Sequence, residues 1–147
     1  MKQIVVQPSL VAWARGFLES ELAALADRFP VLDGVQVVSG EPDVSAREWP
    51  EKLVIVAGEL SGDRDHVMSE ASLRVSVVAG VKEDPGLANA IASVVHGVMR
   101  TAARATAGNP VAEVLSARGP MWADEAQFRA RVLSTFELAL VGDVIDV

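Results

Sequence analysis

The chain has 147 residues, half of them apolar, which is enough for one domain with a buried core. Its formal net charge of −7 argues against a strong nucleic-acid-binding surface, because binding to phosphates needs clustered Lys and Arg. The sequence contains no cysteine, which excludes disulfides, thiol nucleophiles and cysteine-ligated metals. It has no run of roughly 20 apolar residues that would span a membrane, and its first apolar run is too short for a signal peptide. We therefore expect a single acidic domain, residues 1–147, in the cytoplasm.

The first predicted element is a helix over about residues 8–28, which a proline opens and a Phe-Pro pair closes. Apolar residues recur along it every three or four positions, so they form one stripe suited to pack on a sheet. Trp13 and Phe17 lie four residues apart, beside this stripe. The first interpretation is that they widen the buried face, since large exposed patches are uncommon in monomers. The second is that they contact another subunit.

Three strands are predicted next, over residues 35–38, 53–57 and 72–80. The middle strand is apolar at every position, which predicts that both of its faces are covered, one of them by a helix. The third strand alternates between apolar and polar residues, so it has one buried and one wet face. The connections at 40–51 and 58–70 are polar, and we predict them to be long exposed loops.

Asp84 followed by proline predicts the start of a second helix over about 85–104, with the Asp84 carboxylate accepting from the first helical turn. Two further strands are predicted over residues 111–117 and 128–141, the second of them long. The connection between them, residues 118–127, is predicted as a hairpin loop.

The element order is therefore α-β-β-β-α-β-β. Runs of neighbouring strands favour an α+β domain, with a single antiparallel or mixed sheet of about five strands and the two main helices packed on one face. Residues 1–7 and 142–147 lie outside these elements and are predicted to be flexible tails.

The sequence contains no constellation typical of an active site. His66 lies near Asp63 and Asp65 in a polar loop, but the spacing fits neither a calcium loop nor a zinc site, so we interpret this loop as solvated. His96 lies at the edge of a helix's apolar stripe, where a packed or interfacial imidazole is expected. No phosphate-binding glycine motif or serine-nucleophile motif is present. We predict no catalytic residue, no metal and no cofactor.

Aromatic side chains in polar connections are more informative, because a large ring in a loop either folds back on the core or anchors a protein contact. Trp49 and Trp122 are in such positions. Together with the paired aromatics of the first helix, they favour an oligomer. The candidate residues for subunit or partner contacts are Trp13, Phe17, Trp49, Arg118, Met121 and Trp122.

Charge distribution points the same way. Arg129 and Arg131 are predicted on the wet face of strand 128–141, while most of the chain is acidic. Copies that carry opposite charges on separate surfaces can join head to tail, and such contacts close into rings when the rotation permits.

The layout from about residue 10 to residue 141 resembles the tail terminator proteins of long-tailed bacteriophages, also called minor tail or tail-completion proteins. The matching features are a strand leading into a helix of low charge, a short Gly-Pro-Met-Trp signature and a long closing strand. The stretches that carry them are LRVSVVA (73–79), the helix at 85–104, SARGPMW (116–122) and RARVLSTFELALV (129–141).

The resemblance implies a structural virion protein rather than an enzyme. It implies a homohexameric ring at the head-proximal end of the tail, assembled in the host cytoplasm. This ring caps the tube of the major tail protein, ends its polymerisation and offers a surface to the head/neck connector protein, while DNA passes through the pore without specific binding. In such a ring a neighbouring subunit would cover the second face of strand 53–57, and the loops at 40–51 and 59–70 would reach above or below it.

Two alternatives stay open at this point. One is another head–tail connector component, such as a neck stopper. The other is a small cytoplasmic α+β enzyme with an apolar cavity between helix and sheet, using His96 or the loop that contains His66.

Overall fold

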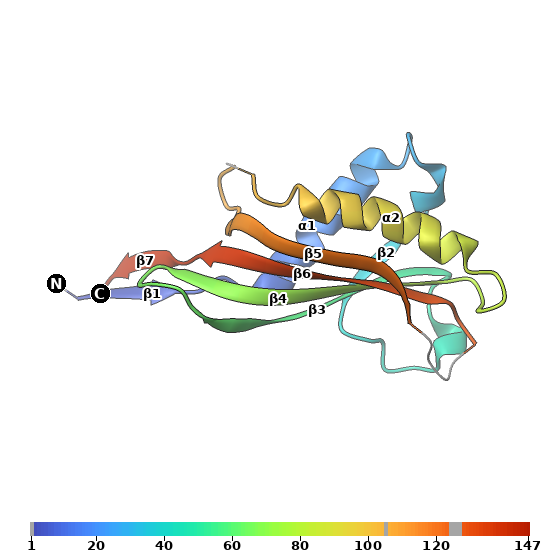
Figure 1. Cartoon of the computed structure of the whole chain (residues 1–147), viewed down its shortest axis with the longest axis horizontal. Coiled ribbons are helices and arrows are strands. Elements are labelled where there is room, and N and C mark those ends of the chain that lie inside the picture. Colours follow the sequence, from blue (N-terminus) through green and yellow to red (C-terminus); the bar gives the residue numbers. More distant parts are fainter. Residues whose placement is uncertain (1, 105, 124–127) are drawn as a thin grey trace.

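Five strands form the main sheet of this protein, in the order β2-β3-β4-β6-β5, in a computed structural model that describes residues 2–104, 106–123 and 128–147. Strand β2 runs parallel to β3, and the other neighbours are antiparallel. Both helices lie on one face of the sheet, so the predicted α+β class is confirmed (Figure 1). These elements are α1 (Leu10–Leu25), β2 (Gln36–Ser39), β3 (Lys52–Asp63), β4 (Met68–Ala79), α2 (Gly86–Arg100), β5 (Val111–Ala123) and β6 (Arg131–Val141).

The core lies between the two helices and the sheet. Helix α1 buries one stripe of residues four apart, which is the pattern the sequence predicts. Phe136 of β6 and Leu73 of β4 face each other across the ladder and are fully buried under α2 and α1. The stripe of α1 consists of Leu10, Ala14, Leu18 and Leu22, and that of α2 includes Ala88, Ile91, Ala92 and Val95.

The β3–β4 hairpin is longer than the sequence predicts. Strand β3 continues to Asp63 and β4 begins at Met68, so only residues 64–67 connect them, and the prediction of a loop over 58–70 is wrong. The outer part of the hairpin is paired along its length but exposed on β3, with Glu59 opposite Ser72. Hydrophobic periodicity reports burial, and these residues form a strand without being buried.

Strand β5 also exceeds its prediction. It extends to Ala123, so the predicted hairpin loop at 118–127 begins as an edge strand; residues 124–127 lie outside the described residues. The register of β5 against β6 shifts at three places. These irregularities interrupt the alternation of apolar and polar residues from which a strand is predicted. Gly119 lies within one of them at a φ of 103°, where a Cβ would approach the Leu133 carbonyl oxygen to 2.7 Å.

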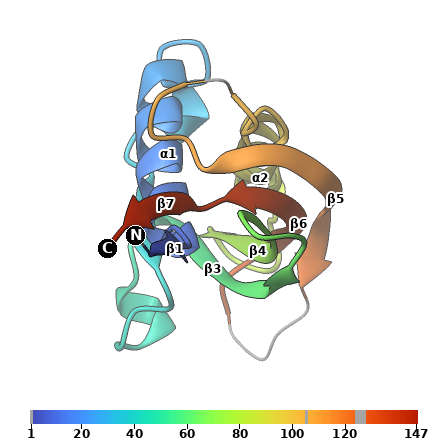
Figure 2. The same cartoon turned by 90° about the vertical axis from the view of Figure 1, so that its left-hand side faces the viewer.

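Two strands lie outside the predicted order. β1 (Gln3–Val6) and β7 (Asp143–Asp146) form an antiparallel two-stranded ribbon from segments that the sequence analysis treats as flexible tails. The ribbon extends beyond one end of the main sheet (Figure 1), and Figure 2 views the molecule from that end. At its base, the buried Ser69 hydroxyl donates to Gln7 Oε1 at 2.9 Å, and the Gly142 N–H donates to the Val67 carbonyl at 2.9 Å. These bonds tie the ribbon to the β3–β4 hairpin.

The helices are shorter than predicted, and short 3-10 turns occur at Pro30–Leu32 and Ala46–Glu48. Asp84 does not take the N-cap position of α2, which is occupied by Pro85; its carboxylate accepts from the Gly86 N–H at 3.4 Å instead. In the described part of the chain, no helix combines the length and the apolar character that a membrane span requires.

Candidate subunit interface

The six candidate contact residues lie in three separate places. Trp13 and Phe17 are on the outer side of α1, where their rings stack with centroids 5.0 Å apart and an interplanar angle of 19°. Both are half-buried and pack against the core. The Arg104 guanidinium lies 5.1 Å from the Phe17 ring centre and binds Glu21. One side of the aromatic pair is thus used within the chain, and its part as a subunit contact stays a prediction.

Trp49 folds back on its own chain. It packs on Leu53, Ile55 and Val78, a small buried cluster on the face of the sheet opposite the helices, which we call the open face. Its indole N–H donates to the Val44 carbonyl at 3.0 Å. The second face of the apolar strand is therefore covered by the 40–51 segment of the same chain. This corrects the expectation that a neighbouring subunit covers it.

Arg129 and Arg131 are not on a wet face. Each is only 5% exposed, which corrects the prediction that they form a basic surface for head-to-tail contacts. The Arg129 guanidinium donates to the carbonyls of Trp49, Pro50 and Glu51 at 3.2, 2.9 and 2.6 Å and to Gly80 at 3.4 Å. The planar guanidinium of Arg129 donates to several carbonyls at once. The alternation of polar and apolar residues in the sequence does not reveal such a contact.

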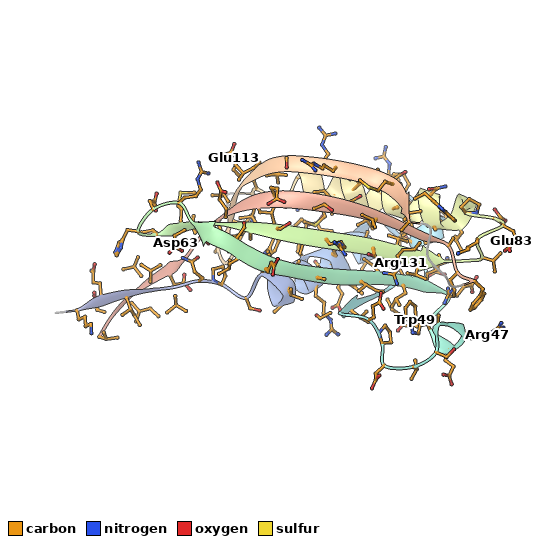
Figure 3. The ribbon with its side chains drawn as sticks, turned by 60° about the horizontal axis from the view of Figure 1, so that its bottom comes forward. Arg47, Trp49, Asp63, Glu83, Glu113 and Arg131 are labelled. Carbon is orange, nitrogen blue, oxygen red and sulfur yellow. The ribbon has the colours of Figure 1, made fainter. Side chains whose placement is uncertain are left out.

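Arg131, the first residue of β6, adds a further bond to the same segment. It binds Glu41 and lies 5.9 Å from the Trp49 ring centre; Figure 3 labels Arg131, Trp49 and Arg47 at this end of the sheet. Burial lowers the pKa of Arg129, partly opposed by the nearby Glu51 carboxylate. We call Arg129, Arg131 and the segment 41–51 that they hold the arginine clamp.

The Gly-Pro-Met-Trp signature lies on the edge strand β5. Arg118 pairs with Thr135 and Met121 with Leu133, so both project from the open face. Trp122 pairs with the buried Val132 and projects from the helix face, 43% exposed. The structure therefore brings Arg118 and Met121 to one side of the sheet and Trp122 to the other, all along an unpaired sheet edge.

His96 of α2 packs on the sheet. Its Nδ1 lies 2.9 Å from the Ser134 hydroxyl, and its ring centre is 5.2 Å from that of Phe136. Ser134 is only 3% exposed. Beside the imidazole, between α2 and β5, is a hollow of about 580 Å³ lined by His96, Arg100 and residues 114–117 and 119. Burial lowers the pKa of His96, and the Arg100 charge lowers it further, so the ring is neutral at pH 7.

This arrangement predicts a pH dependence of stability. In the unfolded chain His96 regains its ordinary pKa of 6.5, so the unfolded state binds more protons between the lowered pKa and 6.5. The free energy of unfolding should therefore fall as the pH drops through 6.5 toward the lowered pKa. Urea unfolding at several pH values should show that His96→Asn removes this part of the dependence while His66→Asn keeps it. Equal profiles for the two variants would contradict the assignment to His96.

In the loop that contains His66, the Asp65 carboxylate binds the backbone of the loop. Asp65 Oδ1 accepts from the N–H groups of Val67 and Met68, each at 2.8 Å. The bond from Met68 and, less strongly, the bond from Val67 lower the pKa of the Asp65 carboxyl. Within the described ranges, no three His, Asp or Glu side chains come together as metal ligands. The loop therefore closes the β3–β4 hairpin through its own backbone.

The surface that sequence reasoning missed is the β1–β7 ribbon. Side chains from both strands share one of its faces, because Ile4 stands opposite Ile145 and Val6 opposite Asp143. We call this side the aliphatic face. Its apolar members and their exposed fractions are Ile4 40%, Val6 45%, Ile145 43% and Val147 65%. The available signal was the β-branched composition of both end segments.

The candidate contact surfaces on the described residues are therefore an aromatic pair on α1, an unpaired edge at β5 and a projecting aliphatic ribbon. No protein-family model and no curated protein sequence matches this chain. A functional assignment rests on the resemblance in layout and on what these surfaces can bind. Their chemistry, apolar contact and ion pairing, suits protein–protein contacts.

Proposed function

We propose that this protein is a structural component of a long-tailed phage that forms a ring at the end of the tail tube, the role implied by its resemblance to tail terminators. The α-β-β-β-α-β-β order of the central elements is consistent with that resemblance. The ring would end polymerisation of the major tail protein and offer a surface to the neck.

The observation that carries the proposal is the β1–β7 ribbon. An isolated two-stranded ribbon is marginally stable in water, and this one projects from the domain with four aliphatic side chains of one face exposed. Neighbouring exposed apolar groups on a projecting arm are typical of an interaction surface. A second copy in a ring would supply the apolar partner that this arm lacks among the described residues of its own chain.

The proposal predicts ring particles. Mass photometry and negative-stain microscopy of the purified protein, alone and with tail-tube protein, should show hexameric rings or rings seated on tube ends. Phage that lack the protein should produce tails of uncontrolled length. A chain that stays monomeric in both samples, together with normal tail lengths in its absence, would contradict the proposal.

The two alternatives predict different outcomes. A neck stopper would bind the head connector and leave tail length unchanged when it is deleted. The enzyme hypothesis draws on one observation, the neutral His96 imidazole beside a hollow. It predicts a turnover that His96→Ala abolishes while assembly is retained, whereas a ring protein would show no such turnover.

A further inference from the structure

We propose that the β1–β7 ribbon of one copy docks on the next copy at the edge of β5, over the hollow between β5 and α2. The inference rests on the proposed function in one respect only, because both require copies of this chain to contact one another. It names the surfaces that make that contact.

The donor surface is the aliphatic face of the ribbon. Its residues come from two paired strands, so the face has a defined shape, and the bonds at its base tie it to the β3–β4 hairpin. Asp143 shares this face with Ile145, and Asp146 lies on the other side of the same strand. Neither carboxylate has an ion pair with any residue that the structure describes. The donor is therefore apolar with two carboxylates outside any such ion pair, and Lys2, paired opposite Val147, adds one cation to the aliphatic face.

The acceptor surface offers one exposed apolar side chain and charges of the opposite sign. At the register shift between Val114 and Ser116, Leu115 has no partner on β6 and is 37% exposed beside the hollow. Arg100 lines the hollow, and Arg118 follows on the same edge strand. Among the described residues, neither arginine has an ion-pair partner. Leu115 and Arg100 thus stand on the helix side of this unpaired edge, and Arg118 stands on its open face.

Charge selects this hollow, whose lining includes the polar side chains of His96, Arg100 and Ser116, over the apolar groove between the two helices. A groove of about 560 Å³ between α1 and α2 is lined by Leu25, Phe29 and Val98, but its Arg104 is already bound to Glu21. Among the described residues that line this groove, no cation is left outside an ion pair for Asp143 to bind. The net charge of −7 makes copies repel one another in general, so a local match of acids with arginines decides both register and partner. The same two acids disfavour an anionic lipid surface as the occupant.

The positions of donor and acceptor make the contact head to tail. The ribbon extends past one end of the sheet, whereas the hollow lies beside the middle of β5, so the ribbon projects away from the hollow of its own chain (Figure 1). Each copy therefore has one surface of each kind. Contacts of this type close into rings when the rotation between copies permits.

Charge reversal tests the contact directly. The donor-reversed protein carries Asp143→Arg and Asp146→Arg, and the acceptor-reversed protein carries Arg100→Asp and Arg118→Asp. Each alone should self-associate roughly tenfold or more weakly than the unchanged protein in sedimentation velocity, because like charges then meet. An equimolar mixture should regain assembly, since the ribbon of each variant then meets a complementary edge on the other. Regained assembly also shows that both variants fold.

A matched pair of substitutions tests whether the aliphatic face of the ribbon contributes to self-association. Ile145→Thr removes an aliphatic group from the aliphatic face, and Val144→Thr makes a similar change on the opposite face, where Val144 is 50% exposed. Both keep a β-branched residue in the strand. Ile145→Thr should weaken self-association and Val144→Thr should not.

The outcomes separate the two proposals. Rings of unchanged stability from both charge-reversed proteins would overturn the docking inference and leave the ring function standing. Failure of the mixture to assemble when each variant is folded and weakened would also overturn it. An unchanged protein that never self-associates, alone or on tail tubes, would overturn both, as would binding of the ribbon to phosphatidylcholine–phosphatidylglycerol vesicles in place of a second copy.

Discussion

Replacing Phe136 by alanine should lower the free energy of unfolding by about 3–5 kcal/mol. The ring is fully buried in the sheet under α2, where it also supports the His96 imidazole. Its removal leaves a cavity that neighbouring side chains on two strands and a helix cannot fill without moving. Such a loss is a large part of the 5–15 kcal/mol by which a domain of this size is usually stable. Urea unfolding followed by circular dichroism measures the effect.

Phe128→Ala provides the matched control. Phe128 is 38% exposed and its outer contact is with the Arg47 guanidinium, 4.9 Å from the ring centre. We expect the free energy of unfolding of this variant to fall by less than about 1 kcal/mol. A half-exposed side chain stays largely in contact with water, so folding gains only the smaller part of its transfer free energy. Equal losses for the two variants would contradict the assignment of Phe136 to the centre of the core.

The Phe136 variant also separates stability from assembly. It should weaken ring formation only through the fraction of unfolded chain, so its assembly defect should vanish when temperature or stabilising salt restores folding. The donor-reversed ribbon variant should behave in the opposite way, with normal unfolding and weak assembly. The two variants together show whether an assembly defect arises at the ribbon or in the core.

The sequence predicts the part of the fold that is buried against the helices. Residues of α1 and α2 recur at helical spacing, and those of β6 alternate from Val132 to Leu140, because each has one side in the core. The outer β3–β4 hairpin and the far end of β5 are paired strands with exposed residues, so they lack this signal. The ribbon was missed because its partner strands are at opposite ends of the sequence.

The candidate interface was predicted less well, for reasons of local chemistry. A tryptophan in a polar segment does not reveal whether it folds back, and Trp49 does so because Arg129 and Arg131 bind the segment around it. Alternation places those arginines on the correct side of the strand but not in a buried environment. Arg118 and Met121 do share one side of an edge strand, whereas Trp122 points to the other.

Arg129→Met should lower the free energy of unfolding by about 3 kcal/mol. The substitution leaves the carbonyls of Trp49, Pro50, Glu51 and Gly80 without their charged donor, in a place where a neutral side chain of similar length keeps water out. Trp49 should then detach from the Leu53 cluster, which Trp fluorescence and hydrogen exchange of residues 49–55 would report. Arg129→Lys should be intermediate, since a single ammonium cannot reach all four carbonyls.

The arginine control is Arg15→Met. Arg15 pairs with Glu19 on the exposed side of α1, with both side chains about half exposed, and such pairs contribute less than about 0.5 kcal/mol. If Arg129→Met costs no more than Arg15→Met, the arginine clamp does not hold the 41–51 segment, and the packing of Trp49 on the Leu53 cluster must hold it instead. The Arg129 measurement therefore separates the contribution of the guanidinium from that of the Trp49 ring in covering the second face of β3.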